Sequence, residues 1–152
     1  MRVLMSGRMK GLLTPGEVHN AFERDPITPE LCNYVSQGVV FEHGCAFLRA
    51  LWAGDPSFRL DRFPDLTGAE CFVNHVHLAD LGIAASKEQL CESVALAGAI
   101  ARLGRPERLR FIISLKDAEC VWRFHRRRRG ERWLDDDLES YREEALLVID
   151  VP

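Results

Sequence analysis

"LRFIISLKDAECVWRFHR", residues 109–126, contains two apolar runs that are separated by a short polar break. The first run, 109–115, is almost wholly apolar, which is typical of a buried strand. The second run, 120–126, indicates another strand, in which Cys, Trp and Phe alternate with Val, Arg and His. The four residues between them, 116–119, suit the turn of a hairpin. This stretch therefore predicts two strands joined by a hairpin turn.

A long helix is predicted just before the hairpin, over residues 87–103. This segment contains no helix breaker apart from Gly98, and its apolar residues recur at helical spacing on two faces. Ser86, three residues before Gln89, has the spacing of a capping box at the helix start. Glycine and then proline occur within residues 104–106, a pattern that ends helices.

Three further segments complete the predicted order of elements. Residues 70–78, "ECFVNHVHL", alternate in polarity and are rich in β-branched and aromatic residues, so they predict a strand. Residues 134–144 predict a short helix, and 145–151, "ALLVIDV", a last strand. The order from residue 70 is therefore β-α-β-β-α-β, which resembles a split β-α-β unit with a right-handed crossover. We expect an α+β fold with one mixed or antiparallel sheet and helices mainly on one face.

The first 70 residues have weaker patterns. Three prolines within residues 15–29 limit any helix there to short pieces. Residues 39–54 predict a strand followed by a helix. We expect residues 1–70 to add helices or edge strands to the sheet, and the whole chain, 1–152, to form a single domain, because 152 residues is an ordinary domain length.

The overall charge argues against a protein built to coat nucleic acid. The net charge is −3 and the isoelectric point is about 6.0, whereas affinity for nucleic acid comes from neutralising phosphates with a positive surface.

The cysteines and the hydropathy pattern predict a cytoplasmic protein. Five cysteines occur at positions 32, 45, 71, 91 and 120, and no two are spaced as a CxxC pair. We interpret them as reduced thiols that behave as small apolar side chains, Cys91 in the predicted helix and Cys71 and Cys120 in strands. The N-terminus lacks the apolar core of a signal peptide, and no run approaches the roughly 20 apolar residues that span a bilayer, so we expect no membrane association.

Three histidines leave open a metal-dependent enzyme. His75 and His77 share one face of their predicted strand, and His125 lies in the later strand, so the three imidazoles would converge if these strands are neighbours. Three histidines with an open position are typical of catalytic zinc. No carboxylate at metal-ligand spacing accompanies them, however, and the chain has no GxSxG elbow or phosphate-binding loop. The favoured expectation is therefore a protein that is not an enzyme and holds no metal or cofactor.

"RFHRRRRGERWLDDDLESY", residues 123–141, is the most highly charged stretch. The run Arg126–Arg129 suits phosphates and leaves open a small nucleic-acid-binding regulator. Residues 123–144, however, contain seven arginines and seven acids, so this segment is neutral. A protein-binding surface is the alternative that we favour. Its candidate partner-binding residues are Asp135, Asp136, Asp137, Glu139, Arg128 and Arg129.

The C-terminal segment resembles the signature of bacterial contact-dependent growth inhibition immunity proteins. The shared pattern is an Arg-Phe-His strand end, then Gly-Glu, Trp-Leu, a leucine, a tyrosine and an acid before the last apolar strand. The matching residues are Arg123, Phe124, His125, Gly130, Glu131, Trp133, Leu134, Leu138, Tyr141, Glu144 and Asp150. The four consecutive arginines are more than this pattern contains at the loop after the Arg-Phe-His strand end.

This resemblance implies a small cytoplasmic antidote. Proteins of that family bind the C-terminal toxin domain that a neighbouring cell delivers, and block its active site. Since such toxins are often nucleases with a basic substrate groove, an acidic surface would both steer association and exclude the nucleic acid. Trp133 or Tyr141 would serve as an aromatic anchor. The expected partner is therefore a cognate toxin domain; the oligomeric state stays open.

Overall fold

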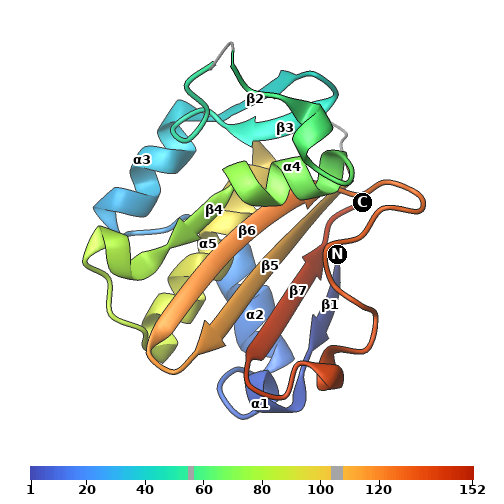
Figure 1. Cartoon of the computed structure of the whole chain (residues 1–152). Coiled ribbons are helices and arrows are strands. Elements are labelled where there is room, and N and C mark those ends of the chain that lie inside the picture. The colour runs from blue at the N-terminus through green and yellow to red at the C-terminus, as the bar shows by residue number, and fades with distance from the viewer. Residues whose placement is uncertain (55–56, 104–107) are drawn as a thin grey trace.

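A five-stranded antiparallel sheet forms the centre of the fold (Figure 1). The computed structural model describes residues 1–54, 57–103 and 108–152. The sheet order is β1-β7-β5-β6-β4, and each neighbouring pair is antiparallel. The strands are β1 (Arg2–Met5), β4 (His75–His77), β5 (Leu109–Lys116), β6 (Glu119–Arg126) and β7 (Ala145–Asp150).

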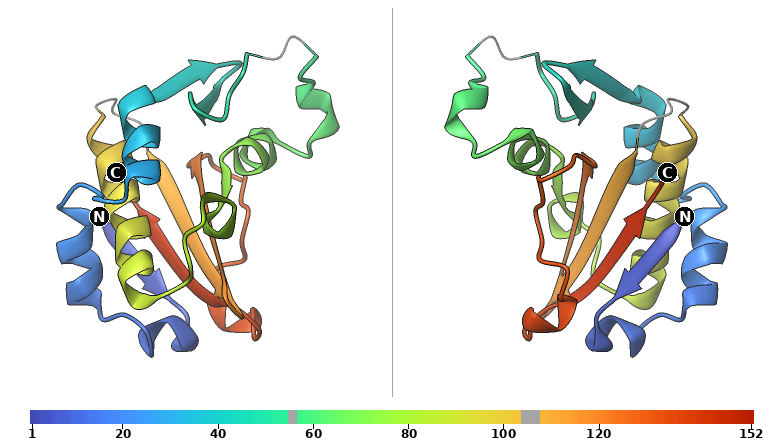
Figure 2. Two further views of the ribbon diagram at one scale, coloured as in Figure 1. Left: turned by 90° about the vertical axis from the view of Figure 1, so that its left-hand side faces the viewer. Right: turned by 90° about the vertical axis from the view of Figure 1, so that its right-hand side faces the viewer.

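Helices cover one face of this sheet, and irregular chain covers much of the other. Figure 2 shows α2 and α5 on one side, with α4 and the segment between β6 and β7 on the other. The helices are α1 (Gly7–Lys10), α2 (Pro15–Phe22), α3 (Pro29–Gln37), α4 (Leu66–Val73) and α5 (Lys87–Arg102). A separate hairpin consists of β2 (Val39–Glu42) and β3 (Cys45–Leu48), and three short 3₁₀ helices span Leu60–Arg62, Leu78–Leu81 and Leu138–Ser140.

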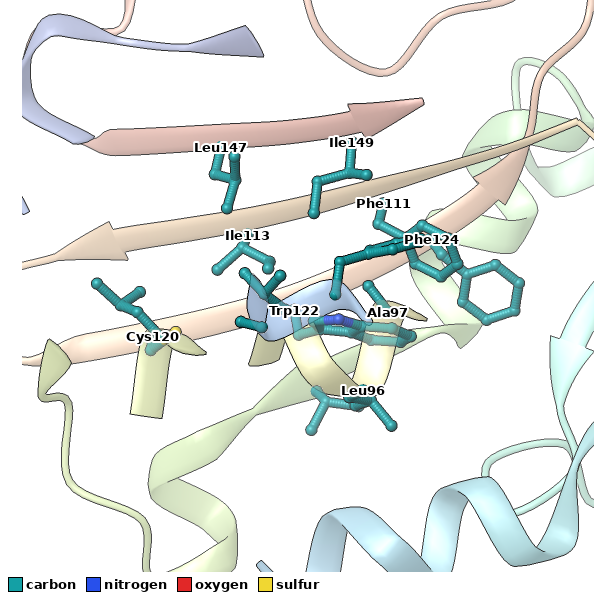
Figure 3. Packing of buried hydrophobic residues seen from close by; sticks show 14 of the residues in the cluster. Leu96, Ala97, Phe111, Ile113, Cys120, Trp122, Phe124, Leu147 and Ile149 are labelled. Carbon is teal, nitrogen blue, oxygen red and sulfur yellow. The ribbon is translucent and has the colours of Figure 1, made fainter. Parts of the chain in front are cut away.

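The main core lies between the sheet and α5 (Figure 3). Phe111, Trp122 and Phe124 are fully buried there and contact one another, with ring centroids 5.6–5.8 Å apart. Leu96 and Ala97 of α5 pack in the same cluster. Burying one such large apolar side chain contributes about 1.5–3 kcal/mol, so this layer dominates the stability of the fold.

A smaller apolar cluster lies on the opposite face. Ile112, Leu146 and Val148 are buried there beneath Leu138 and the partly buried Tyr141. The alternation of side chains along β5 and β7 sends one set to each face. The segment between β6 and β7 is therefore held to the sheet by its own apolar residues.

The structure confirms the α+β fold and most of its later elements. The hairpin, the last strand and the long helix are all present, and Ser86 Oγ accepts the Gln89 amide at 3.2 Å at the helix start. The reciprocal bond of a capping box is missing, since Gln89 Oε1 is buried without a hydrogen-bond partner in the described part of the chain. The predicted stop within 104–106 lies outside the described residues. β4 and β5 are parallel to each other, but β6 lies between them, as in a split β-α-β unit.

The predicted strand over 70–78 is wrong in its first half. Residues 66–73 form α4, and only His75–His77 pair with β6. Asp65 starts this helix by accepting the Gly68 amide at 2.7 Å, a standard N-cap. Packing against the β2–β3 hairpin therefore overrides the strand propensity of the sequence.

The helix expected within 39–54 is also wrong, because this segment contains the β2–β3 hairpin. His43 and Gly44 both have positive φ, at 54° and 79°, as the two-residue turn of a tight hairpin requires.

The helix predicted over 134–144 is reduced to Leu138–Ser140. Asp137 Oδ1 accepts the Glu139 amide at 3.1 Å, and the Tyr141 hydroxyl accepts the Asp135 amide at 3.0 Å. These local side-chain bonds satisfy backbone groups in a non-helical path. Residues 1–70 contribute short helices and the edge strand β1, as predicted.

Candidate functional site on the open face of the sheet

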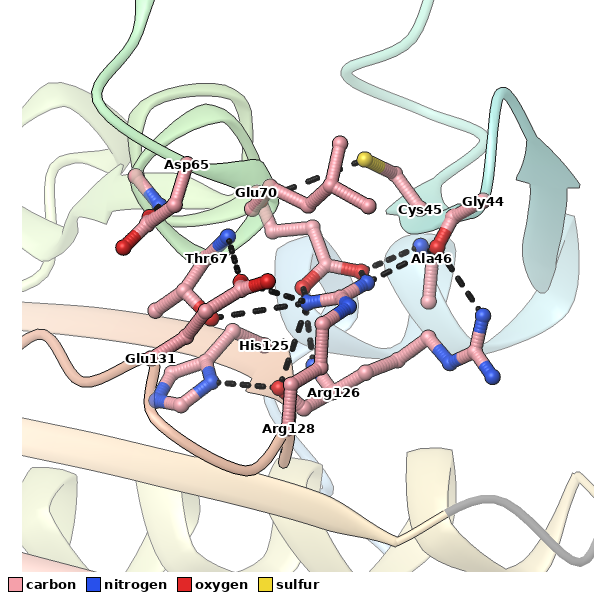
Figure 4. A network of polar contacts seen from close by, with 12 residues as sticks. Gly44, Cys45, Ala46, Asp65, Thr67, Glu70, His125, Arg126, Arg128 and Glu131 are labelled. Atoms are coloured by element: carbon pink, nitrogen blue, oxygen red, sulfur yellow. Dashed lines mark hydrogen bonds and ion pairs between the residues drawn. The ribbon is translucent and has the colours of Figure 1, made fainter.

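A buried glutamate joins α4, the β2–β3 hairpin and the end of β6 (Figure 4). Glu70 is completely buried, and its carboxylate accepts the backbone amides of Ala46 at 2.6 Å and Arg126 at 2.9 Å. Arg128 donates two further bonds to the same carboxylate, at 2.7 and 2.9 Å. This bidentate geometry is the strongest form of an arginine–carboxylate pair. Burial alone would lower the pKa of Arg128, but the bond to Glu70 raises it.

A buried asparagine completes the same connection. Asn74 Oδ1 accepts the Leu48 amide at 2.8 Å, and its side-chain nitrogen donates to the carbonyls of Ala46 at 2.8 Å and Phe124 at 3.1 Å. Both polar atoms of this amide are therefore satisfied. Together Glu70 and Asn74 fix the hairpin over the end of β6.

Three of the four arginines of the run contact other groups of the same chain. Arg126 donates to the carbonyl of Gly44 at 2.9 Å, and Arg127 faces the buried Asp150 at 3.6 Å. Arg128, a candidate partner-binding residue, pairs with Glu70, and its role in partner binding stays a prediction. Arg129 is exposed, as a partner contact requires. Nucleic-acid binding by Arg126–Arg129 stays a prediction.

Two of the three candidate histidines lie together. The rings of His75 and His77 are 4.3 Å apart. His75 Nε2 contacts Arg123 Nη2 at 2.8 Å, and His77 Nδ1 contacts Glu119. Burial, with the nearby charge of Arg123, lowers the pKa of His75 to about 4.

The third histidine does not join them, so the predicted convergence is wrong. Arg123 is the residue opposite His75 in the sheet, and His125 lies beyond it along β6. His125 is buried, and its Nδ1 donates to the carbonyl of Arg126 at 2.7 Å. Within residues 1–54, 57–103 and 108–152, no three His, Cys, Asp or Glu side chains are placed to hold a metal ion.

Two cavities open on this face of the sheet. The basic cavity has a volume of about 370 Å³ and is lined mainly by charged side chains: Arg110, His125, Arg127, Arg128, Gly130, Glu131, Arg132 and Asp136. The aromatic groove has a volume of about 430 Å³ and combines apolar and polar residues: His77, Ile112, Ser114, Lys116, Glu119, Val121, Arg123, Trp133, Leu134, Tyr141, Glu144 and Leu146. Both lie between the strands and the segment that joins β6 to β7.

The aromatic groove has an exposed tryptophan at its side. Trp133 is 41% exposed, and the Arg123 guanidinium lies 5.8 Å from the centre of its ring. The Nε atom of Arg123 is buried and has no hydrogen-bond partner in the described part of the chain. The groove therefore offers an aromatic surface beside a guanidinium donor.

The acidic candidates differ in how they are held. Asp135, Asp136 and Asp137 are all exposed. Asp135 faces Arg132 at 3.6 Å, and Asp137 caps the short 3₁₀ helix. Glu139 is fixed by accepting the Gly7 amide at 2.7 Å, which docks this segment onto α1.

The cysteines are free thiols, and burial makes three of them poor nucleophiles. Cys45, Cys71 and Cys120 are buried, and burial raises the pKa of Cys45 and of Cys120 to about 11. The pKa of Cys71 is raised further by burial. Cys71 lies in α4 and not in a strand as predicted. Cys91 lies in α5, as predicted.

A family model described as "Uncharacterized protein PM0498 family" matches residues 5–152. The chain belongs to this family. The match spans strands β4 to β7 of the sheet, the β2–β3 hairpin and both cavities of this PM0498-family chain, and includes only the last residue of β1. No curated protein and no solved structure matches it significantly. None of the helices in the described ranges is long and apolar enough to cross a membrane.

Sequence reasoning missed the two buried polar residues on which this site of the PM0498-family chain rests. Glu70 and Asn74 lie in the segment that was predicted to be a strand. Their partners in β6 and the following loop are 50 to 58 residues away in sequence. The one local indication is a glutamate among apolar residues at 69–73.

Acidification is expected to destabilise the fold between about pH 6.5 and pH 4. Burial lowers the pKa of His125 to about 4, whereas an unfolded histidine titrates near 6.5. The unfolded chain therefore takes up the proton first, so the stability is present above pH 6.5 and is lost as the pH falls. At pH 5 the loss from this residue is about 2 kcal/mol.

Urea unfolding at pH 7 and pH 5 measures this effect. The variant His125→Asn should show a smaller loss between the two pH values, and the exposed His19→Asn should behave as the wild type. A pH dependence that is the same in all three proteins would contradict the assignment.

Proposed function

We propose that this protein is an immunity protein of bacterial contact-dependent growth inhibition, which binds a cognate toxin domain and blocks its active site. The toxin is a nuclease, and the inhibitor acts in the cytoplasm without catalysis or a cofactor. The supporting observation is the contrast between the two halves of the charged stretch. Its arginines largely contact carboxylates and carbonyls of the same chain, whereas Asp135–Asp137 face outward.

The acidic segment, residues 133–144, is suited to meeting a basic surface. It contains six acids and a single arginine. The Asp135–Tyr141 and Gly7–Glu139 hydrogen bonds fix its path over the sheet. A segment that is already ordered loses little conformational entropy on binding, which favours affinity.

The aromatic groove supplies an anchor next to these charges. Tryptophan and arginine are the residues that most often dominate binding energy at protein interfaces. Trp133 is exposed and Arg123 lies behind its ring. A toxin side chain with a carboxylate or carbonyl would find both an aromatic contact and an unused donor there. Tyr141, in contrast, is partly buried and supports the segment from below.

Coexpression with the toxin domain encoded beside this protein is the decisive experiment. The wild type should form a complex and restore growth. The triple variant Asp135→Asn/Asp136→Asn/Asp137→Asn should associate about 10-fold or more slowly at low salt, because rim charges mainly steer the encounter. Asparagine keeps the cap at position 137.

A matched control removes three exposed acids elsewhere: Glu23→Gln/Glu30→Gln/Asp61→Asn. It has the same net charge as the first variant and should associate as the wild type does. Stopped-flow association rates and growth rescue compare the two. If the wild type neither binds the toxin domain nor protects the cells, the proposed function is wrong. If both triple variants slow association equally, the acidic segment is not the binding surface.

A further inference from the structure

We propose that the basic cavity binds a protonated phosphate group, whose P–OH donates a hydrogen bond to Nε2 of His125. This site goes beyond the immunity function and does not depend on it. The ligand class is inorganic hydrogen phosphate or a phosphate monoester.

The first argument is the unpaired nitrogen of His125. The side chain is only 2% exposed, and its ring lines the cavity. Nδ1 contacts the carbonyl of Arg126, which only accepts, so Nδ1 carries the proton. Nε2 of the neutral ring is then an acceptor, and it is buried without a partner in the part of the chain that the structure describes. Leaving a buried acceptor unpaired is costly, so a ligand that donates to it gains that energy.

The orientation of the ring supports this assignment. Figure 4 shows Nδ1 of His125 turned to the Arg126 carbonyl and the second ring nitrogen pointing away from the Glu70–Arg128 ion pair. The second nitrogen therefore does not belong to the network that holds α4 to β6. Its ring lines the basic cavity.

The second argument is the guanidinium groups around the cavity. Arg128 is engaged by Glu70, and Arg110 holds Asp150 through Nε and Nη2 at 2.7 and 2.9 Å. Arg127 faces Asp150 at a longer 3.6 Å and is 39% exposed. These contacts leave Arg127 able to turn a fork of donors toward an anion.

Arg132 provides a second such group. Its side chain is 62% exposed and faces Asp135 at 3.6 Å, a contact between two solvated groups. Exposed ion pairs of this kind contribute about 0–1 kcal/mol, so a bound anion displaces them readily.

The two acids of the lining disfavour highly charged anions, and the unpaired acceptor of His125 decides which anion fits. Glu131 accepts the Thr67 amide at 3.0 Å, and Asp136 is exposed at the rim. Both repel a fully deprotonated oxyanion. A phosphate that keeps one proton carries less charge than fully deprotonated phosphate and the same charge as sulfate, so it differs from sulfate in having the donor that His125 Nε2 needs. Sulfate, phosphodiesters and carboxylates have no such proton at pH 7, and a phosphate monoester, whose second pKa is about 6, keeps it in about a tenth of the molecules.

Calorimetric titration of the whole protein at pH 7 and constant ionic strength tests the site. Inorganic phosphate should bind at least about 10-fold more tightly than sulfate, which corresponds to one hydrogen bond to a charged group. In His125→Asn this preference should disappear, because the amide nitrogen can replace Nδ1 while nothing replaces Nε2. The ¹⁵N resonance of Nε2 should move on addition of phosphate and not of sulfate.

The arginine variants provide a second arm that does not depend on His125. Arg127→Gln should weaken phosphate binding by about 10-fold or more. Arg129→Gln, an exposed neighbour that does not line the cavity, should leave it unchanged. A nucleoside 5′-monophosphate that binds more tightly than phosphate identifies an ester as the ligand; equal binding identifies free phosphate. Equal affinity for phosphate and sulfate, full binding by Arg127→Gln, or no saturable binding would overturn the proposal.

Discussion

Replacing Glu70 with alanine is expected to lower the free energy of unfolding by about 3–5 kcal/mol, the usual cost of removing one partner from a buried ion pair. The carboxylate is completely buried and accepts four hydrogen bonds, two of them from the guanidinium of Arg128. Its loss leaves that guanidinium and the amides of Ala46 and Arg126 without their acceptor. Because domains have only about 5–15 kcal/mol of stability, this variant should be close to unfolding at 37 °C.

The two sides of this ion pair should not be equivalent. Arg128→Ala leaves Glu70 with both backbone amides, so it should cost less than Glu70→Ala. The double variant should cost less than the sum of the single ones, since the members of one network do not act independently. Arg129→Ala is the matched control, with an exposed side chain next to Arg128. Urea unfolding measures all four. A loss below about 1 kcal/mol for Glu70→Ala would show that the network contributes no more than a surface pair.

This network also marks where sequence reasoning stopped. The β5–β6 hairpin, α5 and β7 could be predicted from the sequence. Each of these segments is a continuous run whose pattern of polar and apolar residues indicates which side chains are buried. The structure of residues 66–77 could not be predicted in this way. Its helix, α4, depends on packing against the β2–β3 hairpin, which the sequence analysis did not predict. The sequence predicts a strand and a helix over residues 39–54, whereas the tight turn at His43 and Gly44 makes this region a hairpin of two strands.

The same reasoning explains which properties of the candidate residues could be predicted. The exposure of Asp135, Asp136 and Asp137 follows from their own polarity and agrees with the structure. The pairing of Arg128 with Glu70 does not follow from its neighbours, because Glu70 is 58 residues earlier in the chain. The histidine cluster failed for a geometric reason: Arg123, and not His125, is opposite His75 in the sheet.

Replacing Gly98 with alanine is expected to destabilise the protein by about 3 kcal/mol, although alanine is the better helix former by about 1 kcal/mol. Gly98 lies in the middle of α5, where a Cβ atom would be 1.8 Å from the carbonyl oxygen of Phe22 and 2.8 Å from its carbonyl carbon. Both are backbone atoms of α2, so the two helices must separate. The separation also breaks the 2.6 Å bond that Arg102 donates to the same oxygen.

Gly16 provides the matched control, because it also lies in a helix and a Cβ there meets nothing within 4 Å. Gly16→Ala should leave stability unchanged or raise it by up to about 1 kcal/mol, since only the helix propensity changes. Urea unfolding of the two variants therefore separates helix propensity from contact between α2 and α5. If Gly98→Ala were as stable as Gly16→Ala, α2 would not be held against α5 at this distance. The helical layer behind both cavities would then be looser than its contacts indicate.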